Sequence, residues 1–472
     1  MRSPYTKIIA TIGPSTWEDD VLIEMLGYGF CVARINASFA DHEELDRVAT
    51  QLRRLSPRVA LMLDTMGHKI RVTGFSAPID LVKGDEITLV SEQFRTNDNA
   101  LKVTYDALHK DVTRNTRILL DDGNIELTVK DINKEKVICT VMDGGRLEPR
   151  KTVNIPGVHL SFPGLSEKDE ADIRYAVSNN FDFVSASFIK HVDDVKRIRK
   201  VMGKSKAKLI AKIENQEGVD NFDEILGAVD AIMIARGDLG VEVAQEKLPI
   251  LQKMMIFKCR SVGKPVIVAT QMLESMRKNK KPTRAEVSDV ANAIMDGTDA
   301  IMLSAETSTG NHPAEAVRTM YEISAEVEPY LQPQMINDRS SASETTDVLC
   351  RHIFTISKEL KIKGVIVFSK TGRSVLSLAR HRLSIPIWSI SSDPTLIRQQ
   401  QLVRGVTGLF LSNISKDRDD AVKQAVEAVY GKGDLELDDK VTVLTGSAIA
   451  NKDTNSILEI VQVKDVLLNQ VS

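Results

Sequence analysis

Eight short runs of apolar and β-branched residues recur along the chain, and stretches with helical periodicity separate most of them. Runs of this length that end abruptly in charge are typical of parallel strands buried on both faces. Eight strands that alternate with helices predict a (βα)8 barrel, or TIM barrel, of the α/β class. A doubly wound sheet is the main alternative because its strands look the same locally, but the count favours the barrel. The runs cover residues 7–13, 31–38, 59–65, 183–188, 208–214, 231–238, 265–271 and 300–307.

The third and fourth runs are too far apart for a single crossover helix. Turn-rich, alternating segments between them predict a small, β-barrel-like all-β domain over residues 73–155, inserted into a barrel formed by 1–72 and 156–330. An insert at the carboxyl end of the third strand is placed to act as a lid. Beyond a polar connector at 332–347, strands and helices alternate again and predict an open α/β domain over 345–472.

Composition excludes several classes of protein. Lys plus Arg (62) nearly balances Asp plus Glu (65), and the net charge of −3 argues against a general binder of nucleic acid or membrane surfaces. Four scattered cysteines and the lack of a secretory leader predict a reduced, cytoplasmic protein. No apolar run approaches the roughly 18 residues that span a bilayer. The eight histidines form no HxH or HExxH pattern, so no zinc site is predicted.

Charged residues follow the apolar runs where each run ends. Lys212 and Glu214 end the fifth run, and Asp238 ends the sixth. Since barrel enzymes place their chemistry at this face, these side chains should converge. Two carboxylates suit one divalent cation, while nearby cations and a hydroxyl suit a phosphoryl group. Each of two residues also has a structural alternative: Arg34 could pair with Asp64 to close a barrel end, and Thr270 could cap a helix. The combined set, Arg34, Arg71, Lys212, Glu214, Asp238 and Thr270, predicts a metal-assisted phosphoryl-transfer site.

Over essentially its whole length the chain resembles the pyruvate kinase family. Matching stretches include TKIIATIGPST, ARINAS, KLIAKIEN, ARGDLGVE and FSKTGRSVLSLAR, and the match over 265–313 is the most specific. The resemblance implies a (βα)8 catalytic domain, a lid-like inserted domain and a C-terminal effector domain, usually in a homotetramer. It also implies transfer of the phosphoryl group from phosphoenolpyruvate to ADP, giving pyruvate and ATP, with Mg²⁺ or Mn²⁺ as cofactor.

The resemblance further implies a role for each matching residue. Lys212 would neutralise the phosphoryl group during transfer, and Glu214 and Asp238 would hold the divalent ion. The backbone amides of Gly237 and Asp238, with the Thr270 hydroxyl, would grip the substrate carboxylate, and Thr270 would start the proton relay to the enolate carbon. The remaining candidates are Arg34, Arg236 and Ser304 for the substrate; Arg34, Asn36, Arg71 and Lys151 for the nucleotide; and Asn36, Ser38, Asp64 and Thr65 for a monovalent cation.

Two motifs depart from the family pattern. Phe39 and Ala40 replace a His-Gly pair, and Met66, His68 and Lys69 replace Lys, Pro and Glu. In potassium-dependent members the last of these positions is a glutamate that helps to retain K⁺. A lysine ammonium carries the same charge as K⁺ and can supply it near the same oxygens. K⁺ is therefore predicted not to be required, although a solvated lysine at the lid hinge is the alternative.

A loop in the C-terminal domain is a candidate effector site. It follows an apolar strand and precedes a helix, so its amides and hydroxyls could cradle a phosphate; an ordinary turn capped by Ser374 is the alternative. Segment 445–455 lacks the Trp and Gly-rich pattern of the family's sugar-bisphosphate site, so a monophosphate effector or none is expected. The loop consists of Ser369, Lys370, Thr371, Gly372, Arg373 and Ser374.

Two other classes of function remain open at the level of sequence. One is a barrel lyase or aldolase acting on a pyruvate enolate, which would need the same metal and arginine but no ADP site. The other is a non-catalytic, effector-binding relative. The presence of Lys212, Glu214, Asp238 and Thr270 together argues against the second.

Overall fold

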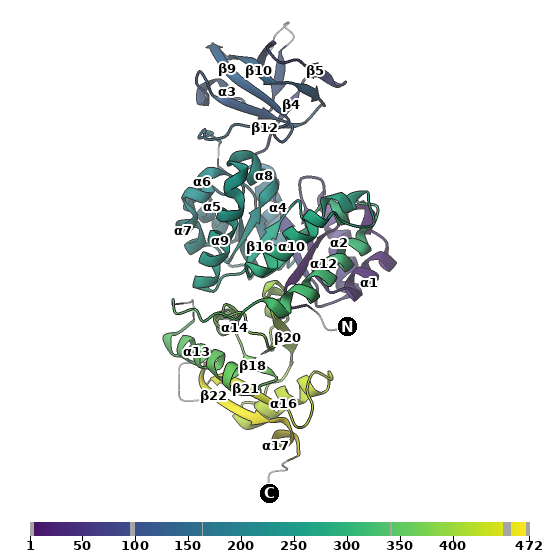
Figure 1. Ribbon diagram of the computed structural model, residues 1–472, viewed down its shortest axis with the longest axis vertical. Helices are drawn as coiled ribbons and strands as arrows, with labels where there is room; N and C mark the ends of the chain where they lie inside the picture. The colour runs from purple at the N-terminus through teal and green to yellow at the C-terminus, as the bar shows by residue number, and fades with distance from the viewer. Residues whose placement is uncertain (1–3, 95–99, 163, 340–341, 447–454, 469–472) are drawn as a thin grey trace.

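The computed structural model describes residues 4–94, 100–162, 164–339, 342–446 and 455–468. Three parts follow one another along its longest axis (Figure 1). A β-rich unit lies at one end, a barrel surrounded by helices lies in the middle, and a smaller α/β unit lies at the other end.

The middle part is a closed barrel of eight parallel strands in the order β1-β17-β16-β15-β14-β13-β3-β2. Closure confirms the predicted (βα)8 barrel and excludes the doubly wound sheet. The strands are β1 (Lys7–Thr11), β2 (Phe30–Asn36), β3 (Ala60–Asp64), β13 (Phe183–Ala186), β14 (Lys208–Ile213), β15 (Ala231–Ala235), β16 (Val266–Ala269) and β17 (Ala300–Leu303). The helices are α1 (Asp19–Gly27), α2 (His42–Leu55), α4 (Glu167–Ser178), α5 (Val192–Met202), α6 (Gln216–Asp220), α7 (Phe222–Ala228), α8 (Arg236–Glu242), α9 (Leu248–Val262), α10 (Arg284–Met295), α11 (Ala305–Ser308) and α12 (Pro313–Val327).

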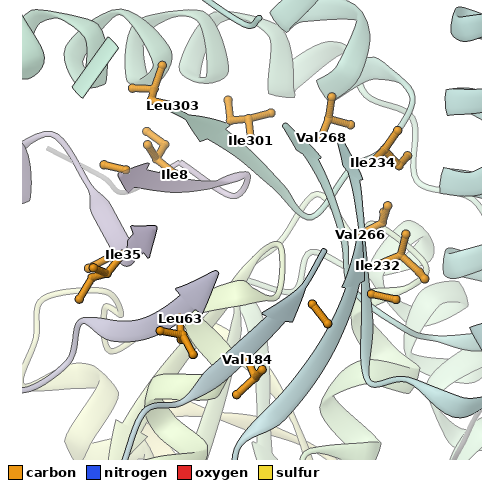
Figure 2. Close-up of a cluster of buried hydrophobic side chains, with 14 of the residues drawn as sticks. Ile8, Ile35, Leu63, Val184, Ile232, Ile234, Val266, Val268, Ile301 and Leu303 are labelled. Atoms are coloured by element: carbon orange, nitrogen blue, oxygen red, sulfur yellow. The ribbon is translucent and has the colours of Figure 1, made fainter. Parts of the chain in front are cut away.

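Alternation along each strand explains why the runs are apolar throughout. Ile232 and Ile234 of β15 point outward into the layer packed under the helices (Figure 2), whereas Met233 between them belongs to the cluster inside the barrel. Successive side chains of a strand point to opposite faces, and both faces of these strands are buried. Each strand therefore reads as a continuous hydrophobic run.

The inserted part is a second closed barrel, of seven strands in the order β10-β6-β7-β4-β12-β8-β9. Its first strand begins at Ile70, before the limit of 73 predicted for the inserted domain. The strands are β4 (Ile70–Thr73), β6 (Glu86–Ser91), β7 (Leu101–Val103), β8 (Arg117–Leu120), β9 (Ile125–Asn133), β10 (Lys136–Asp143) and β12 (Thr152–Asn154); β5 (Ile79–Leu81), β11 (Gly145–Leu147) and the short helix α3 (Leu108–Asp111) lie beside them.

The C-terminal part contains a five-stranded sheet in the order β20-β19-β18-β21-β22. Its four parallel strands fit the alternation of strands and helices predicted for an open α/β domain, and β22, which pairs antiparallel with β21, was not expected. The elements are α13 (Glu344–Glu359), β18 (Gly364–Phe368), α14 (Arg373–Ala379), β19 (Ile387–Ser391), α15 (Pro394–Gln399), β20 (Val406–Phe410), α16 (Arg418–Tyr430), β21 (Lys440–Gly446), β22 (Asn455–Gln462) and α17 (Val463–Leu468).

The C-terminal part closes the amino end of the eight-stranded barrel. Leu402 packs into the apolar cluster inside this barrel. The Lys7 ammonium, at the start of β1, donates a hydrogen bond of 2.7 Å to the Val406 carbonyl. The carboxyl ends of the strands therefore face the inserted barrel, which lies on the opposite side (Figure 1).

The structure bears on the predictions about the cysteines and about membrane-spanning segments. Cys31, Cys139, Cys259 and Cys350 are all free thiols, as their scattered positions indicated. Among the described residues, no helix is both long and apolar enough to cross a membrane.

Candidate active site at the carboxyl end of the barrel

Lys212, near the end of β14, lies at the centre of a buried charge cluster. Its ammonium donates to the Ser187 hydroxyl at 2.8 Å and lies 3.2 Å from Asp64 Oδ1 and 3.0 Å from Glu214 Oε1. Arg34, from β2, donates to the other Asp64 oxygen at 2.6 Å. Parallel strands bring these residues together because their carboxyl ends meet at one face. The expected pairing of Arg34 with Asp64 is present, and it forms part of this larger cluster.

Burial and charge act in opposite directions on the groups of this cluster. Burial alone would raise the pKa of Asp64, but Arg34 and Lys212 hold this pKa below its ordinary value. Burial would lower the pKa of Lys212, yet Asp64 and Glu214 raise it. The lysine therefore carries its charge at neutral pH inside an enclosed site, where a positive charge interacts most strongly with a phosphoryl group.

Glu214 and Asp238 have the properties expected of ligands for a divalent cation. Glu214 is fully buried, and burial raises its pKa, an effect that Lys212 only partly offsets. One Glu214 oxygen accepts the Phe188 amide at 2.7 Å. The other faces the Lys212 ammonium without the alignment of a hydrogen bond. A buried carboxylate oxygen that accepts no hydrogen bond is suited to a hard cation, which prefers oxygen ligands.

Thr270 and Gly237 meet where β15 and β16 end. The Gly237 amide donates to Thr270 Oγ1 at 2.7 Å, and a Cβ atom at position 237 would lie only 3.2 Å from the same oxygen. Thr270 has a φ of 67°, which is unusual for a β-branched residue. Its hydroxyl donates to the Ala269 carbonyl at 2.6 Å. Strain held at one polar residue is frequent at functional sites.

Arg236 stabilises the turn that contains Thr270. Its guanidinium pairs with Asp289 of α10 at 2.6 Å and donates to the Thr270 carbonyl at 3.1 Å. The side chain is buried, and these partners lie on neighbouring elements. These contacts fix the Arg236 side chain relative to the Thr270 turn, and its predicted contact with the substrate remains a prediction. Ser304, at the end of β17, is half-buried, and its amide donates to Glu306 at 2.8 Å.

Two predicted nucleotide contacts lie on the inserted barrel. Arg71, in β4, donates to the Arg150 carbonyl at 2.9 Å, and Lys151 pairs with Asp121 at 2.7 Å. Arg71 lies within a strand of the inserted barrel, and Lys151 lies directly before another strand, β12.

The residues predicted to hold a monovalent cation already have partners within the protein. The Thr65 carbonyl accepts the Ser187 hydroxyl at 2.7 Å, and Asn36 Oδ1 accepts the Ser38 amide at 3.1 Å. Asp64 is held by Arg34 and Lys212, as described above.

Lys69, which enters β4, lies against the second predicted metal ligand. Its ammonium is 3.2 Å from Asp238 Oδ1 and 5.3 Å from the centre of the Phe188 ring. The lysine is only partly exposed. It is thus a structural part of this face and not a freely solvated side chain at the hinge.

A cavity of about 620 Å³ extends from this face to the links between the two barrels. Its lining includes Thr65, Lys69, Asp238, Asn154 and Glu242. Asn154, at the end of β12, donates to Glu242 of α8 at 3.0 Å, and burial raises the pKa of Glu242.

Ser187, in the fourth apolar run, was not among the predicted site residues. Its hydroxyl accepts from Lys212 and donates to Thr65, so it fixes the lysine relative to β3. The only sequence signal was its position in the SFIK stretch that ends the fourth run.

The candidate effector loop forms a compact turn before α14. The Gly372 amide donates to Ser369 Oγ at 2.9 Å, and Gly372 has a φ of 85°. Lys370 and Thr371 are exposed, whereas Ser374 is buried. Residues 447–454, which would form most of the other half of a sugar-bisphosphate site, lie outside the described residues.

The fold and this cluster define a lid-bearing (βα)8 barrel enzyme whose site suits a divalent cation and a polyanion. The model of the pyruvate kinase barrel domain matches residues 3–317, and that of the pyruvate kinase alpha/beta domain matches residues 347–461. Pyruvate kinases of Geobacillus stearothermophilus and Bacillus licheniformis are each 38% identical to the chain over 475 residues, which is 98% of this chain and 81% of each relative. The pyruvate kinase of Staphylococcus aureus strain MRSA252 is 38% identical over 476 residues, with the same coverage. The chain belongs to the pyruvate kinase family.

Proposed function

We propose that the cluster around Lys212 transfers the phosphoryl group of phosphoenolpyruvate to ADP, the glycolytic reaction of the family, and that the enolate is then protonated to pyruvate. The observation that carries this assignment is one buried, charged lysine between Asp64 and Glu214 at the carboxyl face of the barrel. The bond from phosphorus to the enol oxygen breaks, and a bond from phosphorus to a terminal ADP oxygen forms. Lys212 offsets the negative charge on the phosphoryl group during this exchange.

The residues of the face divide the remaining tasks between them. Glu214 and Asp238 would hold Mg²⁺ or Mn²⁺, which supplies charge neutralisation for the enolate oxygen and the carboxylate when bound. Thr270 and the Gly237 amide orient the carboxylate, and the Thr270 hydroxyl passes a proton toward the enolate carbon. Arg34 would contact the phosphate, since its guanidinium already lies beside Lys212's partner Asp64.

Arg71, Lys151, Asn36 and Ser304 remain candidates for substrate and nucleotide contacts. The first two would act when the inserted barrel closes over the face, because they lie on or beside its strands. Residues 1–72 with 156–330 would then form the catalytic domain, and 73–155 the lid. Residues 345–472 would form the effector and oligomerisation domain of a cytoplasmic homotetramer.

A monophosphate effector, or none, is proposed for the loop 369–374. Support comes from the buried Ser369 hydroxyl, which orders the turn, and from the exposed Lys370 beside it. Calorimetry with fructose 1,6-bisphosphate tests this directly, because tight binding of that bisphosphate would overturn the proposal.

The reaction itself is tested by measuring ATP and pyruvate together from phosphoenolpyruvate and ADP, with and without a chelator. Equal amounts of both products are expected, and the chelator should abolish both. A lyase or aldolase that uses the same face would release pyruvate without ATP, and a non-catalytic relative would yield neither product.

A further inference from the structure

Two histidines and a glutamate that line the cavity converge on one another. His159 lies on the chain that returns from the inserted barrel, His191 precedes α5, and Glu217 lies on α6. Their nitrogen and oxygen atoms all lie within 4.8 Å of one another. We call these three residues the His159–His191–Glu217 cluster.

The two distances from histidine nitrogen to glutamate oxygen suit a tetrahedral metal ion, and the two histidine nitrogens lie within 4.8 Å of each other. His159 Nδ1 is 3.3 Å from each Glu217 oxygen, and His191 Nε2 is 3.3 Å from Glu217 Oε2. Zinc binds nitrogen and carboxylate oxygen at roughly 2.0–2.2 Å, which places neighbouring tetrahedral ligands about 3.3–3.5 Å apart. Two histidines and one glutamate form a known zinc ligand set that leaves a fourth position for water.

The surroundings of the cluster favour a cation. Among the described residues that line the cavity, six are carboxylates and only three are lysine or arginine. One of the latter, Lys190, opposes binding because its ammonium lies 3.6 Å from Glu217 Oε1. This lysine would have to be displaced from Glu217 when a metal ion binds.

A neighbouring side chain orients His191. Asn221 Nδ2 lies 3.0 Å from His191 Nδ1 and also donates to the carbonyl groups of Lys190 and Glu217, so the Nε2 atom points at Glu217. Metal binding at Nε2 places the proton on Nδ1. The Asn221 amide must then turn its oxygen toward the ring.

We propose that the His159–His191–Glu217 cluster binds a divalent transition-metal ion of the Zn²⁺ type, which fastens the segment returning from the inserted barrel to α5 and α6. Imidazole nitrogen distinguishes this site from Glu214 and Asp238, because Mg²⁺ prefers oxygen ligands whereas Zn²⁺ and Co²⁺ accept nitrogen. The proposal does not depend on the catalytic assignment.

The test is Co²⁺ titration of the full chain in saturating Mg²⁺, followed by visible absorption. A four-coordinate site with nitrogen ligands gives intense cobalt bands, whereas an octahedral oxygen site gives weak ones. We expect intense bands in the unmodified protein that Zn²⁺ removes, and loss of these bands in His159→Asn and Glu217→Gln. His352→Asn, an exposed histidine of α13, is the matched control and should retain the bands.

Two further variants test the opposing contacts. Lys190→Met removes the competing ammonium, and Asn221→Asp supplies a carboxylate that accepts from Nδ1–H. Each should tighten cobalt binding, about tenfold or more for Asn221→Asp, as partners of a metal-bound histidine typically do. Weak bands only, or intense bands unchanged in both His159→Asn and Glu217→Gln, would overturn the proposal.

Discussion

At the scale of single residues, the charge of Lys212 has a structural role and a proposed catalytic role. It offsets the charges of Asp64 and Glu214 in a buried site, and in the proposed mechanism it presents a cation to the substrate. A group that is already paired within the protein needs little reorganisation when a phosphoryl group arrives. The same pairing predicts that the barrel will remain folded when the lysine is removed. Asp64 keeps Arg34 as a partner, and Glu214 can take up a proton because its pKa is already raised.

Lys212→Met should therefore leave the fold intact and remove most of the turnover. Loss of one preorganised charge typically costs about 10²–10³ in turnover, while the metal ligands and the Thr270 grip should retain substrate. Steady-state kinetics measures the loss of turnover, and circular dichroism checks that the fold is intact. Lys208→Met, at the start of the same strand and half-exposed, is the control and should remain fully active. Retention of more than about a tenth of the turnover would mean that Lys212 is not the main cation for the transfer.

Lys69 is the second residue whose charge should be decisive. Its ammonium already lies 3.2 Å from Asp238, so a fixed cation occupies this side of the face. Turnover should be similar in potassium and tetramethylammonium salts at matched ionic strength. Lys69→Glu should introduce a preference for K⁺ of about tenfold, equivalent to roughly 1.4 kcal/mol in the barrier.

The control for this experiment is Lys196→Glu, because Lys196 is an exposed lysine of α5 that pairs only locally with Asp193. This variant makes the same charge change as Lys69→Glu but lies away from the candidate active site. It should therefore acquire no K⁺ dependence. If the unmodified protein lost its activity when K⁺ was replaced, the lysine would not be acting as the substitute cation.

At the scale of elements, the turns after the strands are held by side chains from neighbouring helices. Asp289 of α10 fixes Arg236 behind the turn of Thr270, and Asp169 of α4 fixes the chain that leaves β3. Gly67 in that chain has a φ of 67°, and a Cβ atom there would lie 2.7 Å from the Phe188 ring. The link into the inserted barrel is therefore a defined structure whose position depends on α4.

Asp169→Asn should loosen this link. The carboxylate accepts the Met66 amide at 2.9 Å, the Gly67 amide at 3.2 Å and the Ser166 hydroxyl at 2.7 Å. In the asparagine variant, an NH₂ group replaces one of the two accepting carboxylate oxygens and faces a hydrogen-bond donor. Such a mismatch typically lowers the free energy of unfolding by about 1–3 kcal/mol. Thermal unfolding should shift down, and amide hydrogen exchange should rise at residues 66–70. Asp193→Asn, an exposed acid of α5, should change neither quantity; a similar effect in both variants would exclude a specific role for Asp169.

At the scale of the whole molecule, the proposed active site and the C-terminal part lie at opposite ends of the barrel. The proposed active site is at the carboxyl end, which faces the inserted barrel, and the C-terminal part contacts the amino end (Figure 1). Arg382 makes a paired contact with Asp299 at 3.0 and 2.7 Å, and both side chains are buried. Asp299 also accepts the amides of Val266 and Arg404. One carboxylate thus joins the barrel to the C-terminal part.

Arg382→Met should destabilise the protein strongly while sparing turnover at low temperature. Removing one partner leaves a buried carboxylate without its cation, which typically costs about 3–5 kcal/mol. The double variant Arg382→Met with Asp299→Asn removes that charge and should recover part of the loss. Lys206→Met breaks an exposed contact between the same two parts and should cost about 1 kcal/mol or less. Equal stability of Arg382→Met and Lys206→Met in thermal unfolding would contradict this account.

The sequence alone determined the barrel and the chemical types at its face. Strands buried on both sides must be apolar throughout, so all eight were visible as runs, and the polar residues that end them could be assigned to one face. Some strands were not predicted individually. β12 is only three residues long and has no distinctive run, and β22 was not expected although residues 457–461 read ILEIV.

Only the tertiary structure decided which side chains meet. The Lys69–Asp238 contact spans 169 positions, the roles of Ser187 and Asp289 depend on neighbouring strand ends, and the His159–His191–Glu217 cluster joins three segments with no shared motif. Histidine spacing along the chain predicted no zinc site, because spacing reports ligands only when they share a helix or a turn. Closure of the barrel brings such residues together, and the apolar pattern that directs closure carries no information about the polar contacts that result.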